Sequence, residues 1–533
     1  MKIVLFLLWL LFIALPIGNR GLWSPDEPRY LQVAWEMAQA KSYVIPLLNE
    51  EPYSHKPPLF FWLTILAAQI FPFETASRWV SALASLGTLI LTFLMGRRAA
   101  DERTGFTASL IFMSCYLPAL LMHSGNIDTL LTFLTTLSFY FFITWEGEQR
   151  RKWIVLAYGA CGLGVLAKGP AALLIPWLTF FVWTIFKFPG RDKASFSHLI
   201  WGPLLSLAVV SLWLIPACIE GGAEYREMIL FKQNIGRAIS SFAHAEPWYF
   251  FLANFPALSL PWFIVLLGAI PDLKRAWKEK EGPLFFCILW FCVVLVFFSL
   301  ISGKRSRYLL PAFPAFSIML AHIVARWQDE GKGSRSLSLM GILILTFGAL
   351  LLIFPMLLPL FQKKWPLLEI FPVSGHDWRL WAFYGGGVML GVLLWRSFRY
   401  VAEKQNIRAS WLFSSALLVS FGMGQVYCIP YLDKVKSARA ATEKIREILP
   451  PDGSIAFYKK RYDNGWNFYL KRRARIPVVL SLDELKEAEP MFDVVIARNI
   501  HAGQLEELMK DNVYRVASIE RIGHKRFLLL KRP

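Results

Sequence analysis

The residues best suited to chemistry gather in one stretch, residues 23 to 58. It opens with W-S-P-D-E-P-R-Y, closes with Y-S-H-K-P-P, and holds Asp26, Glu27, Arg29, His55 and Lys56. A carboxylate can serve as a general base or a metal ligand, a histidine can bind a metal or a phosphate, and a lysine can hold a phosphate. Charged clusters flanked by proline and by apolar runs cost stability, so this stretch predicts a functional site at a membrane surface.

The first cluster is expected at the start of a helix. Ser24 and Glu27 have capping-box spacing, with Pro25 at the first helical position. Pro28 disfavours helical geometry at the residue before it, so a helix that begins at Pro28 is the alternative. In both cases Asp26 lies near a helix N-terminus, where the helix dipole favours its ionised form. The two acids could also do no more than cap this helix.

Further charged residues stand where apolar surroundings make a charge costly. Asp128 lies at the start of an apolar run, and Lys56, Lys168 or Arg307 are its candidate partners. The segment S-G-K-R-S-R-Y, residues 302 to 308, carries three cations on a face where few are expected. These cations suggest a bound anion such as a lipid phosphate, although snorkelling toward lipid headgroups is the alternative.

Membrane helices must position these residues. The chain has 533 residues, of which 56% are hydrophobic and 18% charged, and its mean hydropathy is +0.44. A soluble domain has about 25% charged residues, so the sequence predicts an all-α polytopic membrane protein. About fourteen apolar stretches recur along it. The stretch 58 to 72 is short and begins after Pro57, so it predicts an interfacial or re-entrant helix and leaves about thirteen transmembrane helices.

The distribution of lysine and arginine predicts which loops face outward. Basic loops near residues 97, 150, 187, 274, 326 and 396 alternate with less basic ones, and the positive-inside rule assigns them to the cytoplasm. The loops 19–75 and 219–246 then lie outside. The net charge of +19 reflects this topology, so nucleic acid is not expected as a partner. The six cysteines fall in or beside apolar runs, where they are expected to pack.

The chain divides into a transmembrane domain, residues 1–430, and a soluble α/β domain on the outer side, residues 431–533. In the second part, helix-like runs at 435–449, 482–487 and 502–509 alternate with strand-like runs at 454–457, 476–480, 493–497, 514–518 and 526–530. We expect an accessory role for this domain, because its sequence carries neither a nucleotide-binding glycine pattern nor metal-ligand spacing.

Four motifs together resemble one family. They are D-E-x-R-Y after the first span, K-P-P-L before the next, an aspartate in the fourth span, and R-Y-x-x-P beyond residue 300. This set resembles the bacterial lipid A aminoarabinose transferases, which are GT-C membrane glycosyltransferases related to the protein O-mannosyltransferases. The resemblance covers roughly residues 1 to 430. It implies transfer of a sugar from a polyprenyl (undecaprenyl) phosphate donor to lipid A or another cell-envelope glycan, at the periplasmic face of the bacterial inner membrane.

The resemblance also assigns roles to residues. Asp26 would be the catalytic carboxylate, with Glu27 of the same motif as a second catalytic residue and Arg29 as a substrate-binding residue. The donor-phosphate pocket would be lined by Tyr30, Tyr53, Lys56 and Tyr308, with Asp128 beside it and Lys168 and Arg307 as further substrate-binding residues. The aminoarabinose enzymes carry a glutamate before K-P-P as part of a metal site, where this chain has His55, and Asn234 stands where a histidine would be expected. A divalent metal (Zn, Mn or Mg) would therefore need different ligands, for which His55, Asn234 and His244 are the candidates, and an imidazole ligand favours Zn.

The chemistry fits a single displacement with inversion. Departure of the sugar builds negative charge on the donor phosphate, and fixed cations such as Lys56 and Arg307 stabilise it. A hydroxyl acceptor would need Asp26 as a general base, whereas a phosphate acceptor is already ionised. Other functions stay open: a flippase or transporter of the same lipid, a protein O-glycosyltransferase, or a receptor whose outer domain binds a ligand. The sequence leaves the sugar, the acceptor, the metal and the oligomeric state open.

Overall fold

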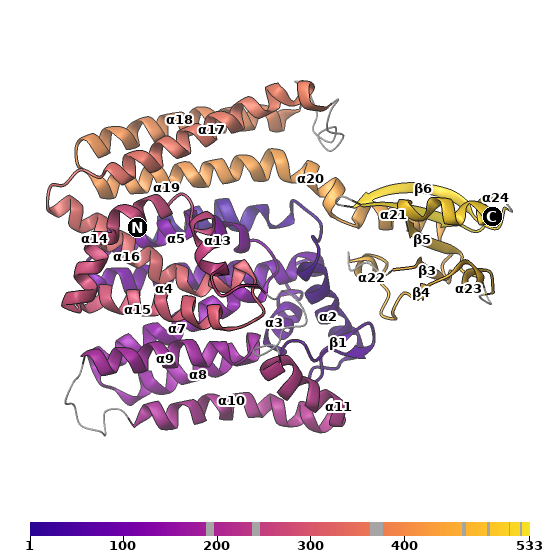
Figure 1. Cartoon of the computed structure of the whole chain (residues 1–533), viewed down its shortest axis with the longest axis horizontal. Helices are drawn as coiled ribbons and strands as arrows, with labels where there is room; N and C mark the ends of the chain where they lie inside the picture. Colours follow the sequence, from indigo (N-terminus) through magenta and orange to yellow (C-terminus); the bar gives the residue numbers. More distant parts are fainter. Residues whose placement is uncertain are drawn as a thin grey trace.

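The computed structural model describes residues 1–187, 197–236, 246–362, 377–460, 465–487, 491–510, 512–522 and 525–533. Most helices lie side by side in one elongated bundle, and a small domain with a β-sheet projects from one end of it (Figure 1). The residues before 431 form the bundle and its loops. The remainder, residues 431–533, is called the C-terminal domain below.

The first half of the bundle contains the elements that carry the predicted motifs. It comprises α1 (Lys2–Trp9), η1 (Leu10–Ala14), η2 (Leu15–Gly18), α2 (Asp26–Ala40), β1 (Leu47–Leu48), β2 (Glu51–Pro52), α3 (Leu59–Ala67), α4 (Phe73–Ala99), α5 (Glu102–Ser114), α6 (Tyr116–Leu121), α7 (Ile127–Glu148), α8 (Arg151–Lys168) and α9 (Ala171–Lys187). The second half comprises α10 (His198–Glu220), α11 (Gly222–Glu227), η4 (Met228–Gly236), α13 (Phe250–Leu258), α14 (Phe263–Glu279), α15 (Gly282–Leu300), η5 (Ser306–Ala312), α16 (Phe313–Asp329), α17 (Arg335–Gln362), α18 (Trp378–Ala402), α19 (Asn406–Met423) and η7 (Gly424–Cys428).

Within the described residues, seven helices are long and apolar enough to cross a membrane, or eight if the bent pair α13 and α14 forms one span. The segments Lys2–Gly18 and Ala171–Phe186 are shorter apolar helices. The protein is therefore a helical multi-span membrane protein, although fewer helices meet this measure than the thirteen or so predicted. The difference arises partly where apolar runs break: α5 ends after 13 residues, because Cys115 adopts an extended conformation before α6.

The short stretch after Pro58 does not form a span. Helix α3 has nine residues, which at 1.5 Å per residue is about 14 Å and less than half of a hydrocarbon core of about 30 Å. This length agrees with the predicted interfacial or re-entrant helix. Helix α3 packs against α2 and α4, so it holds the second charged motif beside the first.

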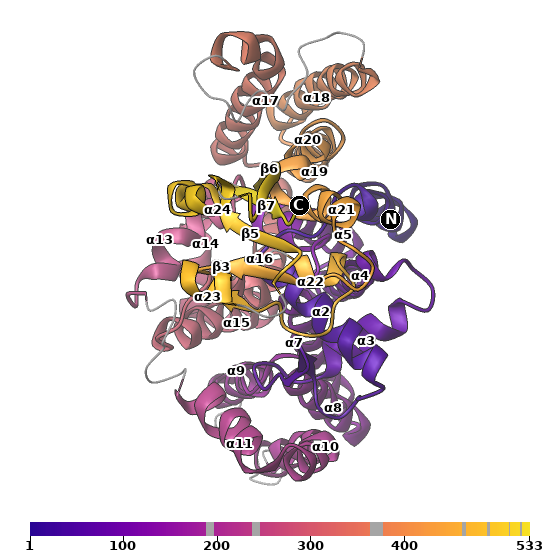
Figure 2. The same cartoon turned by 90° about the vertical axis from the view of Figure 1, so that its right-hand side faces the viewer.

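The centre of the bundle is a continuous apolar core in which the span formed by η5 and α16 is the most enclosed candidate, with 89% of its apolar window buried. In contrast, only 28% of the corresponding windows of α10 and α17 are buried. These two helices lie on opposite sides of the bundle, beside α11 and α18 respectively (Figure 2). Their exposed apolar surface requires a lipid environment, because large exposed apolar patches are unfavourable in water.

The C-terminal domain begins within α20 (Ile429–Lys436), which continues α19 and η7. It comprises α21 (Arg439–Ile448), β3 (Ile455–Tyr458), α22 (Trp466–Tyr469), β4 (Val478–Val479), α23 (Leu482–Glu487), β5 (Val494–Arg498), η8 (Asn499–Leu505), α24 (Glu506–Lys510), β6 (Arg515–Ile522) and β7 (Lys525–Lys531). Its strands form a mixed sheet in the order β4-β3-β5-β7-β6, parallel at β4-β3-β5 and antiparallel at β5-β7-β6.

Each of the five predicted strand-like runs overlaps one strand of this sheet, which confirms the predicted α/β character. The run 435–449 is divided between α20 and α21, because Ser437 is extended. The sequence reading missed α22.

Candidate functional site

Helix α2 begins at Asp26, with Pro25 as its N-cap residue. Both predicted starts are therefore wrong. Pro28 occupies the third helical position, where its missing N–H costs nothing because the first N–H groups of a helix have no partner within the helix. The carboxylate of Glu27 accepts a hydrogen bond from the backbone N–H of Trp23 at 3.1 Å.

Asp26 binds arginines from a distant part of the sequence. Its Oδ2 atom lies 2.5 Å from an Arg307 nitrogen and 3.0 Å from an Arg305 nitrogen, and its Oδ1 atom lies 3.8 Å from Arg29. The side chain of Asp26 is only 7% exposed. Burial alone would raise the pKa of Asp26, but the charges of the three arginines outweigh it and hold the pKa below its ordinary value. Asp26 is therefore a carboxylate at neutral pH.

Aromatic side chains join the second predicted motif to the first. Tyr30, one turn after Asp26, packs against Phe61 with 6.2 Å between ring centroids, and Tyr53 packs edge-on against the same Phe61 at 6.1 Å. His55 is exposed and stacks on Tyr53 at 5.1 Å. Lys56 follows in the chain and is half-buried. Burial raises the pKa of Tyr30, so its hydroxyl stays protonated.

Asp128 and Lys168 form a buried ion pair beside these residues. Asn126 accepts a hydrogen bond from the N–H of Thr129 and thereby caps α7, which places Asp128 in the first turn. The ammonium of Lys168, at the end of α8, lies 4.0 Å from the centroid of the Tyr308 ring. Of the three predicted partners of Asp128, Lys168 makes the direct contact, and Arg307 interacts electrostatically with Asp128 as well as with Asp26.

The cluster carries an excess of positive charge. Four cations, Arg29, Arg305, Arg307 and Lys168, share two carboxylates, Asp26 and Asp128. These six side chains therefore leave two positive charges in excess. In a partly buried place such an excess is stabilised by an anion, and guanidinium and ammonium groups suit a phosphate. The predicted residues Asp26, Arg29, Tyr30, Tyr53, Asp128, Lys168, Arg307 and Tyr308 lie in or beside this one cluster.

Glu27 binds a different set of groups. Arg20 and Arg78 each donate two hydrogen bonds to its carboxylate at 2.7 to 3.0 Å, and the N–H of Gly125 donates another at 2.9 Å. The Arg78 side chain is completely buried and also donates to the carbonyls of residues 17, 20 and 21. Glu27 thus joins the start of α2 to α4 and to the loop before α7, whereas Asp26 belongs to the cationic cluster.

The sequence reading missed Arg20 and Arg78, and it named Arg305 only as one of the unexpected cations. A signal for Arg78 was present, since it is a charged residue at the start of a long apolar run, and a charge in such a place usually has a partner.

The predicted metal ligands are only partly placed. His244 lies outside the described residues, and Asn234 lies on η4 but its side chain is outside the described part. Among the residues that the structure does describe, three or more histidine, cysteine, aspartate or glutamate side chains nowhere gather closely enough to hold a metal ion. The described residues around His55 therefore do not complete a metal site by themselves.

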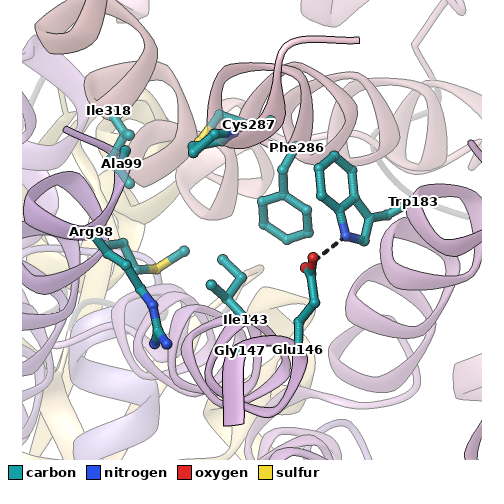
Figure 3. A pocket seen from close by; sticks show the side chains of 12 residues that line it. Arg98, Ala99, Ile143, Glu146, Gly147, Trp183, Phe286, Cys287 and Ile318 are labelled. Atoms are coloured by element: carbon teal, nitrogen blue, oxygen red, sulfur yellow. Dashed lines mark hydrogen bonds between the residues drawn. The ribbon is translucent and has the colours of Figure 1, made fainter. Parts of the chain in front are cut away.

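A separate cavity of about 230 Å³ lies toward the other end of α7. Glu146 on its wall accepts a hydrogen bond from the Trp183 indole at 3.0 Å, and Arg98 lies on another wall (Figure 3). Eighteen residues of α7 separate Glu146 from Asp128, which is about 27 Å along the helix. This cavity therefore does not belong to the cationic cluster.

Comparison with known proteins places the chain in one group. Residues 55–215 match the family described as dolichyl-phosphate-mannose-protein mannosyltransferase. The chain is 32% identical over 355 residues to undecaprenyl phosphate-alpha-4-amino-4-deoxy-L-arabinose arabinosyl transferase 2 of Pseudomonas fluorescens (strain Pf0-1), a match that covers 64% of this chain and 62% of that protein. It is 28% identical over 450 residues to the corresponding transferase of Pseudomonas aeruginosa (strain UCBPP-PA14), which covers 80% and 78%.

Solved structures agree on the fold. ArnT from Cupriavidus metallidurans, bound to undecaprenyl phosphate, superposes with a TM-score of 0.76 at 18% identity, covering 99% of this chain and 96% of that one. The archaeal oligosaccharyltransferase AglB from Archaeoglobus fulgidus gives a TM-score of 0.53 at 13% identity, covering 94% and 69%. The resemblance indicated by the motifs is thereby confirmed: the chain is similar over much of its length to the bacterial undecaprenyl phosphate aminoarabinose transferases, and it has the fold of ArnT.

Proposed function

We propose that this protein is a membrane glycosyltransferase that moves a sugar from an undecaprenyl phosphate donor to an acceptor in the cell envelope. The names of the relatives supply 4-amino-4-deoxy-L-arabinose as the first sugar to test, and the motifs supply lipid A as the first acceptor. The observation that carries the proposal is the cationic cluster, whose two excess positive charges suit the donor phosphate.

In the proposed reaction, the bond between the anomeric carbon and the phosphate oxygen breaks while the acceptor oxygen bonds to the opposite face of that carbon. The electron pair of the broken bond stays on undecaprenyl phosphate, which gains negative charge as it leaves. Arg305, Arg307 and Lys168 stabilise this charge, and removing one such group typically lowers turnover roughly 10²–10³-fold. The result is inversion at the anomeric carbon.

The protonation state of Asp26 indicates which chemical group of the acceptor attacks the sugar. A carboxylate whose pKa is held down by arginines is a weak base, so it removes a proton from an alcohol poorly. A phosphate acceptor arrives already ionised and needs no base. Asp26 then serves to hold Arg305 and Arg307 together, and a phosphate group of a glycolipid such as lipid A is the acceptor that suits this site best.

The proposal includes a location and a topology. It puts the protein in the bacterial inner membrane, with the cationic cluster and the C-terminal domain on the periplasmic side. It also includes about thirteen crossings. Besides the seven or eight helices that are long and apolar enough, α1 with its continuation, α5, α8, α9 and α18 pack in the same bundle and would cross with them.

A divalent ion held through His55 stays a prediction. Its test is dialysis of the active protein against a chelator, followed by return of Zn, Mn or Mg. The ion would be supported if dialysis abolished donor cleavage and the return of one of these ions restored it. His55→Ala should then show neither the loss nor the restoration. Unchanged cleavage would remove it from the proposal.

The experiment for the function uses purified protein, undecaprenyl phosphate-aminoarabinose and lipid A, and measures release of undecaprenyl phosphate. We expect release with the wild type and none with Asp26→Asn. The matched control is Asp272→Asn, which changes another aspartate that binds an arginine, Arg275 at 2.9 Å, and it should stay active. Movement of the donor across vesicles without cleavage of its sugar bond would instead indicate a transporter, and full activity of Asp26→Asn would show that its role is misassigned.

A further inference from the structure

We infer that the C-terminal domain positions Asp26, so that turnover depends on contacts between this domain and residues 21 to 28. This inference rests on the proposed function. It concerns a domain for which the sequence indicated only an accessory role. The groups that carry it are Asp433, Tyr469 and the segment immediately before Asp26.

Hydrogen bonds join the domain to this segment. Oδ1 of Asp433 accepts from the N–H of Gly21 at 2.8 Å and from the indole N–H of Trp23 at 2.7 Å. The hydroxyl of Tyr469 accepts from the N–H of Leu22 at 2.7 Å. Ser437 pairs with Trp23 in an antiparallel bridge. Three consecutive residues, the last of them three positions before Asp26, are thus held by side chains of the C-terminal domain.

Apolar contacts reinforce these bonds. Leu22 and Leu31 are completely buried in the same apolar cluster as Ile445, Trp466 and Phe527 of the C-terminal domain. Helix α2 therefore forms part of that domain's core, and separating the two would expose both leucines to water, which is unfavourable. The ammonium of Lys436 also lies 4.4 Å from the Trp23 ring centroid, so a cation–π contact adds to the attachment.

Two glycines permit this close approach. A Cβ atom on Gly21 would lie 2.3 Å from Oγ of Ser437 and 2.8 Å from the hydroxyl oxygen of Tyr469, which is too close. Gly465 has a φ of +84°, and a Cβ atom there would lie 3.0 Å from Cβ of Pro28, a residue of the D-E-P-R motif itself. The C-terminal domain therefore packs directly on the motif as well as on the residues before it.

The same tyrosine also reaches the membrane domain. The Tyr469 hydroxyl donates to a carboxylate oxygen of Glu74, in the first turn of α4, at 2.6 Å, and Arg439 binds the same oxygen. Farther along α2, the amide of Gln32 donates to the carbonyl of Arg472 at 3.1 Å. The start of α2 is thus enclosed between the C-terminal domain on one side and the Glu27, Arg20 and Arg78 cluster on the other.

Position matters here because Asp26 must meet arginines from another element. Arg305 and Arg307 come from the segment at η5, and Lys168 comes from α8, so a shift of α2 would not carry these three cations with it, although it would move both Asp26 and Arg29. Such a shift would move Asp26 relative to them, and a misplacement of about 1 Å at a reacting centre can lower a rate roughly 10²-fold. Donor binding through the cations should change little, whereas turnover should fall.

The experiment compares two variants with two matched controls. Tyr469→Phe removes the bridging hydroxyl, and Asp433→Ala removes the acceptor for Gly21 and Trp23. Tyr514→Phe removes a hydroxyl that bonds to the carbonyl of Phe492 within the same domain at 2.7 Å, and Asp483→Ala removes an exposed acid of α23. For each full-length protein the number of undecaprenyl phosphate binding sites per chain, the donor KM and kcat per site are measured.

We expect kcat per site to fall roughly tenfold or more in both test variants, with the site number and the donor KM near wild type and with both controls unchanged. Wild-type kcat per site in both test variants would overturn the inference. So would a fall in activity matched by an equal loss of binding sites, because the contacts would then support folding only. A wild-type protein that cleaves no donor would overturn the proposed function and this inference with it.

Discussion

The carboxylates of Asp26 and Glu27, on consecutive residues of α2, bind two separate sets of arginines. Asp26 binds Arg305, Arg307 and, at a longer distance, Arg29 in the partly buried cationic cluster, and Glu27 binds Arg20 and Arg78 in the protein interior. Substitutions at the two positions should therefore have different effects, although both residues belong to one motif.

Replacing Glu27 by glutamine should destabilise the protein. The variant leaves Arg20 and Arg78 buried without their counter-charge, and breaking a buried ion pair from one side costs about 3–5 kcal/mol. We expect a clearly lower midpoint of thermal unfolding in detergent or a loss of folded protein. The control is Glu279→Gln, which removes an exposed carboxylate of α14. Equal midpoints for the two variants would contradict the structural role of Glu27.

Acid should destabilise the protein only at low pH. Burial would raise the pKa of Glu27, but the charges and hydrogen bonds of Arg78 and Arg20 bring it well below its ordinary value, and the pKa of Asp26 is also lowered. A carboxylate whose pKa is lower in the folded state contributes stability above its unfolded pKa, about 4 for these residues, and that stability is lost as the pH falls further.

The unfolding midpoint should therefore be nearly constant from about pH 8 to 5 and fall below about pH 4. Thermal unfolding followed across this range checks the expectation, with Glu27→Gln as the comparison, because that variant has already lost the larger contribution. A steep fall of the unfolding midpoint between about pH 7 and 5 would mean that Asp26 and Glu27 do not dominate the pH dependence of stability.

The sequence was sufficient to find most of the cationic cluster. Its residues stand out because charge is costly beside apolar runs, and this argument singled out Asp26, Asp128, Lys168 and Arg307 without any knowledge of contacts. It could not choose among three partners for Asp128, because that choice depends on how α8 and η5 lie relative to α7. It also could not identify the partners of Glu27, because Arg20 lies outside the motif and Arg78 lies on α4, and only the fold brings them together.

The fold was predictable to a similar extent. Alternating apolar runs and turns located the strands of the C-terminal domain, and hydropathy located the helices of the bundle. The break between α5 and α6 at Cys115 was not visible, because the run remains apolar across it. The packing of Leu22 and Leu31 into the C-terminal domain was also not visible, since it joins residues more than 400 positions apart in the sequence.

Removing one arginine from the cluster should weaken both binding and turnover. Arg307→Ala deletes the guanidinium that lies 2.5 Å from Asp26, and we expect kcat/KM for the donor to fall roughly 10²–10³-fold. The control is Arg97→Ala, at an exposed position near the C-terminal end of α4, and it should have the same kcat/KM as the wild type. The measurement is initial-rate release of undecaprenyl phosphate, and a loss below about threefold in Arg307→Ala would exclude Arg307 from the phosphate site.

Substitutions of Asp128 and Lys168, which form a buried ion pair, should have opposite effects on donor binding. Lys168→Gln removes a cation and lowers the positive excess, so the donor should bind more weakly. Asp128→Asn removes an anion and raises the excess, so donor binding should be retained or tightened. Undecaprenyl phosphate binding to each purified variant, measured at low and high salt, checks this. Equal weakening by both substitutions would indicate that the pair only supports the packing of α7 on α8.

The side of the membrane on which the C-terminal domain lies decides the side of Asp26, because Asp433 is hydrogen-bonded to Gly21 at 2.8 Å. We expect alkaline phosphatase fused after Pro533 to be active and a green fluorescent protein at the same place to be dark, since the former folds only outside the cytoplasm. The same reporters fused after Lys280, in the basic turn between α14 and α15, should give the reverse result. A cytoplasmic signal at Pro533 would put Asp26 on the face away from lipid A, and the proposed reaction could not take place there.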